Sequence, residues 1–122
     1  MTTLLTLPGP DVPVIDESRL MSEFGGSPEI LAELRDLFLA HAPPLYEGIG
    51  QALAAGGLPT IVEMAHSLKG ACATYGAGRL AMVCKGLELT ARAGNLEAAR
   101  QWREALDREY AAVFAAIGGI RA

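Results

Sequence analysis

The sequence predicts an all-α protein, an antiparallel four-helix bundle with an additional short N-terminal helix. Three observations lead to this prediction. Apolar residues make up 51% of the chain and are mostly Ala and Leu, whereas aromatic residues make up 6%, a composition that favours helices over strands. Several segments repeat apolar residues at helical spacing, and glycine or proline separates them. The connections are short, so consecutive helices are expected to pack antiparallel.

Size and charge narrow the possible function. A chain of 122 residues suits one domain, and a net charge of −4 without a basic stripe argues against binding to nucleic acid or anionic membranes. No apolar run reaches the roughly 18–20 residues that span a bilayer, and the N-terminus does not resemble a secretory signal. Cys72 and Cys84 form no CxxC pair, so we expect reduced, buried thiols in a cytoplasmic protein.

The first half of the chain divides at prolines and glycines. Residues 1–13 contain three prolines and are expected to form a flexible N-terminal segment, followed by a folded domain over residues 14–122. Asp16 is the expected N-cap of a short helix that ends at about Phe24. A long helix is expected to begin at Ser27-Pro28-Glu29 and to end at Gly56-Gly57. Pro43-Pro44 either kinks it or splits it, and we favour one kinked helix because the apolar register continues.

Three further helices are expected in the second half. One covers about Pro59–Tyr75, and the turn Gly76-Ala77-Gly78 separates it from the next, which covers about Arg79–Ala93 and ends at Gly94. Asn95 is the expected N-cap of a last helix that continues to about Ile117, before Gly118-Gly119. This last helix carries an apolar stripe that we assign to the core, namely Trp102, Leu106, Tyr110, Val113 and Ile117.

The third helix carries an unusual outer face. Helical spacing gathers its expected core residues on one side, namely Ile61, Met64, Leu68, Ala71 and Tyr75. His66 points away from them, together with Val62, Lys69, Gly70 and Ala73. A glycine inside a helix costs about 1 kcal/mol relative to alanine, and packing within the bundle does not explain an outward glycine. Close approach by another protein does, so Val62, Gly70 and Ala73 are interpreted as a docking surface.

The residue types on this face suit phosphoryl transfer. A neutral imidazole is a competent nucleophile near pH 7, and the ammonium of Lys69, one turn from His66, offsets charge on an arriving phosphoryl group. The sequence has no glycine-rich nucleotide loop, no Walker lysine and no acidic cluster for magnesium. We therefore expect no cofactor of its own and no metal site, and we place the magnesium ion and the acyl phosphate on a partner protein.

The segment around His66 and the residues that follow it resemble a known protein family. The segment His66-Ser67-Leu68-Lys69-Gly70, followed by Gly76-Ala77, Leu80-Ala81, Cys84 and Leu87-Glu88, resembles the core of bacterial histidine-phosphotransfer (HPt) domains. The likeness extends over about residues 14–117, so the chain resembles a stand-alone HPt protein. Ala71-Cys72 stand where the family usually has small polar residues, a departure that does not affect the active face.

The resemblance implies a role for each matching residue. His66 is the residue phosphorylated, at Nε2, Lys69 assists the phosphoryl group, Gly70 leaves room for a receiver domain and Gly76 lies in the turn that ends the helix. The implied function is relay of a phosphoryl group between receiver-domain aspartates in two-component signal transduction, without kinase or nucleotide-binding activity. The implied partners are response-regulator receiver domains and a hybrid or sensor histidine kinase, and a monomer is sufficient.

Other interpretations remain open at this stage. His41 is expected to be a partly buried or capping residue rather than a site, and Arg79 and Lys85 either add positive potential near the phosphoryl group or are simply solvated. A competing hypothesis is a non-catalytic adaptor, which binds a histidine kinase or a receiver domain and acts by occupying its surface. A third hypothesis is a metal- or redox-responsive helical bundle that uses His41, Cys72 and Cys84.

Overall fold

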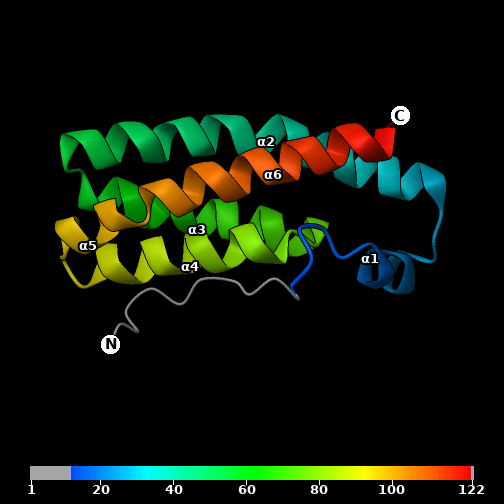
Figure 1. Ribbon diagram of the computed structural model, residues 1–122, viewed down its shortest axis with the longest axis horizontal. Coiled ribbons are helices and arrows are strands. Elements are labelled where there is room, and N and C mark those ends of the chain that lie inside the picture. Colours follow the sequence, from blue (N-terminus) through cyan, green and yellow to red (C-terminus); the bar gives the residue numbers. More distant parts are fainter. Residues whose placement is uncertain (1–11, 122) are drawn as a thin grey trace.

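The computed structural model describes residues 12–121, with side chains described for residues 12–118. Six helices follow one another, namely α1 (Glu17–Phe24), α2 (Pro28–Ala55), α3 (Leu58–Tyr75), α4 (Gly78–Arg92), α5 (Leu96–Gln101) and α6 (Arg103–Arg121). The long helices α2, α3, α4 and α6 lie alongside one another, and α1 lies at one end (Figure 1). The predicted all-α bundle is confirmed. The flexible segment predicted for residues 1–13 falls almost entirely outside the described residues.

The helix ends follow the capping residues that the sequence analysis identified. Side chains of Asp16, Ser27 and Asn95 accept hydrogen bonds from backbone N–H groups in the first turns of α1, α2 and α5. Gly56 and Gly76 end α2 and α3 in the left-handed conformation, with φ of 82° and 83°, which costs glycine little. Helix α2 runs through Pro43-Pro44, so the prediction of one helix rather than two is confirmed.

The last helix differs from the prediction. It is divided at Trp102 into α5 and α6, and it continues through Gly118-Gly119 to Arg121. The Trp102 ring packs against Gly86 of α4 so closely that a Cβ at residue 86 would lie 2.1 Å from a ring atom. At the break, the backbone N–H of Trp102 donates a hydrogen bond to the carbonyl oxygen of Ala99, with an N–O distance of 3.1 Å. Glycine lowers helix propensity without forbidding helical angles, so Gly118-Gly119 do not stop α6.

Helix α3 lies between two neighbours, because it packs against both α2 and α4. Its fully buried stripe consists of Ile61, Ala65, Leu68, Cys72 and Tyr75. Met64 and Ala71, predicted as core, are only partly buried. Met64 packs over Gly48 of α2, where a Cβ would lie 2.2 Å from the Met64 sulfur. The buried stripe is therefore rotated slightly around the helix axis relative to the predicted one, with which it shares Ile61, Leu68 and Tyr75. His66 still lies outside it.

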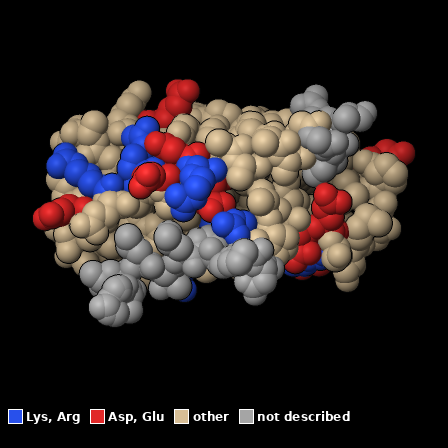
Figure 2. Space-filling model, viewed as in Figure 1, with Lys and Arg blue, Asp and Glu red and all other residues tan. Residues whose placement is uncertain are grey.

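The surface agrees with the expected charge pattern. On the face shown in Figure 2, acidic and basic side chains alternate and form no continuous basic area. Among the described residues, no helix has the length and apolar character required to cross a membrane.

Candidate phosphoryl-transfer site

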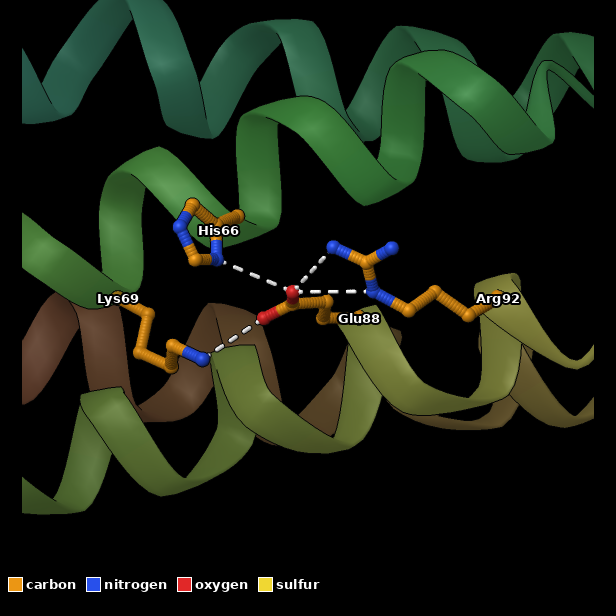
Figure 3. A network of polar contacts seen from close by, with 4 residues as sticks. All are labelled: His66, Lys69, Glu88 and Arg92. Carbon is orange, nitrogen blue, oxygen red and sulfur yellow. Dashed lines mark hydrogen bonds and ion pairs between the residues drawn. The ribbon is translucent and has the colours of Figure 1, made fainter.

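His66 projects from α3 toward solvent, and its side chain is 62% exposed. Its Nδ1 atom lies 3.0 Å from Oε2 of Glu88, a residue of α4. Figure 3 shows that the other ring nitrogen, Nε2, points away from Glu88. The helix pair α3–α4 thus holds one edge of the imidazole and leaves the other edge open.

Glu88 is the centre of the polar network. The residue is only 5% exposed, and three side chains converge on its carboxylate (Figure 3). Lys69 of α3 donates to Oε1 at 2.8 Å. Arg92, one turn after Glu88 on α4, donates to Oε2 through Nη2 at 2.9 Å and through Nε at 3.2 Å. A buried carboxylate with this many donors satisfies the general requirement that buried charge be paired.

The network keeps Glu88 ionised and orients the His66 ring toward it. The hydrogen bond from Lys69 holds the pKa of Glu88 at about 2, against an ordinary value of 4.5, with further lowering by Arg92 and His66 and with burial opposing them. Glu88 is therefore ionised near neutral pH and acts only as an acceptor. Nδ1 of His66 must then carry the proton, and the lone pair of the neutral ring lies on the exposed Nε2.

The predicted docking residues share one face with His66. Gly70 and Ala73 are exposed and Val62 is partly buried. Apart from its chain neighbours and the backbone of its own helix, a Cβ added at Gly70 would meet no atom of the described residues within 4 Å. An open groove of about 840 Å³ lies beside His66, lined by Leu58, Pro59, Val62, Glu63, His66, Ser67, Ala91 and Arg92. Of the three predicted docking residues, only Val62 lines this groove, which extends toward the first turn of α3.

Two residues of the site have no functional role in the sequence analysis. Glu88 and Arg92 both lie within the segment that resembles HPt domains, but sequence reasoning assigns neither of them a role. The signal that identifies Glu88 is an acidic residue at a buried position of α4, next to Leu87 and one turn after Cys84. An arginine four residues after it is the usual helical partner.

Other expectations concern residues away from His66. His41 is exposed rather than partly buried, and its Nδ1 lies 2.9 Å from the Leu37 carbonyl oxygen, one turn earlier in α2. Arg79 does not point at the site, because it forms an ion pair with the buried Glu109 of α6, with an Nε–Oε1 distance of 2.9 Å. Lys85 is exposed.

The cysteines lie in the core, as predicted. Cys72 and Cys84 are both fully buried and free. A hydrogen bond with Cys72, together with burial, raises the pKa of Cys84 well above its ordinary value, so its thiol stays protonated and unreactive. Within residues 12–121, no group of three or more His, Cys, Asp and Glu side chains has an arrangement that could hold a metal ion.

The depressed pKa of Glu88 predicts how stability depends on pH. Its folded-state pKa of about 2 lies below the ordinary 4.5, so its ionisation stabilises the fold above pH 4.5, and this stabilisation is lost as the pH falls toward 2. The contribution is at most about 3 kcal/mol. Urea unfolding at pH 7, 4.5 and 3 should show an acid loss of stability that is smaller in Glu88→Gln. An equal loss in both proteins would contradict this assignment.

Comparisons with known proteins identify the family of this chain. A family model described as the Hpt domain matches residues 33–116. Among solved structures, histidine-containing phosphotransfer protein B (HptB) from Pseudomonas aeruginosa PAO1 is similar, with 32% sequence identity and a TM-score of 0.81, over 91% of this chain and 96% of that chain. A search of curated proteins found no match. The chain belongs to the Hpt domain family, whose members carry phosphoryl groups in phosphorelays.

Proposed function

We propose that His66 accepts a phosphoryl group from the phospho-aspartate of one receiver domain and passes it to the aspartate of another. The observation that carries this proposal is the exposed imidazole whose Nδ1 faces the ionised, buried Glu88. This chain thus supplies the nucleophile His66, the carboxylate of Glu88 that orients it, and the nearby ammonium of Lys69. The protein acts as a phosphocarrier, and the acyl phosphate and its magnesium ion belong to the receiver.

The transfer balances without any other reactant. The Nε2 lone pair of His66 attacks phosphorus, an N–P bond forms, and the bond between phosphorus and the aspartate oxygen breaks to leave a carboxylate on the receiver. The proton on Nδ1 stays in place, so the phosphorylated ring is an imidazolium. Glu88 stabilises its positive charge through the hydrogen bond to Nδ1. Attack by the second receiver's carboxylate reverses each step.

Lys69 is placed to stabilise the phosphorylated state. Its ammonium is one turn from His66 and is already desolvated in part, since the side chain is 31% exposed. Among the described residues, one of its three possible donors has a partner, Oε1 of Glu88 at 2.8 Å. The flexible stem of lysine allows the ammonium to turn toward the oxygens of a phosphoryl group on Nε2.

Gly70 provides a test of docking that does not disturb the fold. Because a Cβ at residue 70 would enter open space among the described residues, Gly70→Gln should leave the bundle as stable as before or up to about 1 kcal/mol more stable. The same side chain occupies the space of a docked receiver over Val62, Gly70 and Ala73, and transfer should fall at least about tenfold. Transfer kinetics and thermal melting measure the two effects. Unchanged transfer would refute the docking role.

The proposed function is tested by incubation with a receiver that carries a labelled phosphoryl group. The expected product is a label on this chain that is lost in acid and stable in alkali, as for a phosphoramidate. The competing interpretation is an adaptor that occupies the receiver without chemistry. Stable binding of the phosphorylated receiver without any label on this chain would support the adaptor and overturn the proposal.

A further inference from the structure

Two cations share the carboxylate of Glu88, and they differ in their position relative to His66. Lys69 holds Oε1, whereas Arg92 holds Oε2, the same oxygen that lies against Nδ1 of His66. In Figure 3, Arg92 lies on the Nδ1 side of the ring, and Nε2 points away from it. Arg92 therefore faces the anchored edge of the imidazole and not the edge that would carry a phosphoryl group.

The charges of the network explain why two cations are present. In the resting state, Lys69 and Arg92 together exceed the single negative charge of Glu88 by one. A phosphoryl dianion on a protonated ring adds a net charge of about −1, which neutralises this excess. As the Lys69 ammonium turns toward the phosphoryl oxygens, its bond to Glu88 weakens. A buried carboxylate that loses its counter-charge is strongly destabilised. The imidazolium of the phosphorylated ring supplies one counter-charge at Oε2, and a second cation that stays bound keeps the carboxylate paired in both states.

Arg92 has the features of that second cation. Two of its N–H groups converge on Oε2, and a planar guanidinium holds such a geometry more firmly than an ammonium does. The other helical ion pairs of this kind, Arg19–Glu23 and Arg103–Asp107, join acids that are 49% and 45% exposed. The acid paired with Arg92 has a side chain only 6% exposed.

We propose that Arg92 is a positioning residue that keeps Oε2 of Glu88 against Nδ1 of His66 and so releases Lys69 to bind the phosphoryl group. This inference rests on the proposed function. It assigns different roles to the two cations, since Lys69 contacts the phosphoryl group and Arg92 acts through Glu88.

A double-mutant cycle separates this role from independent contributions. The measured quantity is the hydrolysis rate of the phosphorylated protein in Lys69→Ala, in Arg92→Gln and in the double variant. Lys69→Ala should accelerate hydrolysis about tenfold in the wild-type background, as expected for one lost charge-assisted hydrogen bond. In the Arg92→Gln background Lys69 stays bound to Glu88, so Lys69→Ala should change the hydrolysis rate by less than about threefold. Equal factors in both backgrounds would overturn the proposal.

Nuclear magnetic resonance of the unphosphorylated protein supplies a second readout. Arg92→Gln should raise the pKa of the Glu88 carboxyl and lower the fraction of His66 protonated on Nδ1 alone, whereas Arg92→Lys should restore both in part. Arg103→Gln removes a helical ion pair elsewhere on the surface and should change neither. A His66 tautomer that does not respond to Arg92→Gln would refute the positioning role. If these spectra respond but His66 never accepts a phosphoryl group, the relay fails and the coupling of Arg92 to His66 stands.

Discussion

Replacement of His66 by Gln should reduce the rate of phosphoryl transfer from a phosphorylated receiver to this chain by at least about 10³-fold. Removal of a catalytic nucleophile typically has an effect of this size or larger. Glutamine has no ring nitrogen that can form a phosphoramidate. Because the His66 side chain is 62% exposed, its replacement leaves the packed core unchanged. The measurement is the initial rate at which label passes from the receiver to this chain, with binding of the receiver measured separately.

The matched control for this experiment is the second histidine. His41 is also exposed on a helix, but within the described residues the polar partner of its ring is a backbone carbonyl. His41→Gln should therefore accept label at the wild-type rate. Label retained in His66→Gln and lost in His41→Gln would move the site to α2 and contradict the structure-based assignment.

Glu88→Gln should slow phosphoryl transfer by about 10²-fold, in the range measured for groups that orient a reacting histidine. Glutamine has nearly the same shape, so the α3–α4 packing is retained. A neutral amide no longer stabilises the positive charge of the phosphorylated ring, and it presents an NH₂ group as readily as an oxygen to Nδ1. Rapid-quench measurement of transfer from a saturating phosphorylated receiver reports the chemical step directly.

Glu109 provides the matched control for Glu88. It is a buried acid as well, 2% exposed, but its partners are Arg79 and Arg108 and not the histidine. Glu109→Gln is expected to lower the free energy of unfolding while leaving the transfer rate unchanged. If both variants slow transfer equally, the effect of Glu88 is one of general stability, and its orienting role is wrong.

The helices were predictable because local signals define them. Asp16, Ser27 and Asn95 start helices through side-chain caps, and Gly56 and Gly76 end them through positive φ. The break at Trp102 was not predictable from local signals, and it coincides with a contact of the indole with Gly86 on another helix. No local propensity marks that position as an interruption.

The site was predictable in part. His66, Lys69 and Gly70 lie on one outward face of one helix, so their spacing alone brings them together. Glu88 and Arg92 come from α4, and their contact with His66 depends on how α3 and α4 are aligned. Helical periodicity within one segment contains no information on that alignment. The exact burial of α3 was missed for the same reason, since its contacts with α2 and α4 decide which residues are covered.

The proposed relay requires that the phosphoryl group be attached to Nε2 of His66 while Nδ1 remains protonated and bonded to Glu88. Nuclear magnetic resonance of phosphorylated protein with labelled histidine measures the coupling between phosphorus and each ring nitrogen. We expect one phosphorus signal coupled to Nε2 of His66, with a protonated Nδ1. A phosphorus signal coupled to Nδ1, or located on any other residue, would refute this assignment.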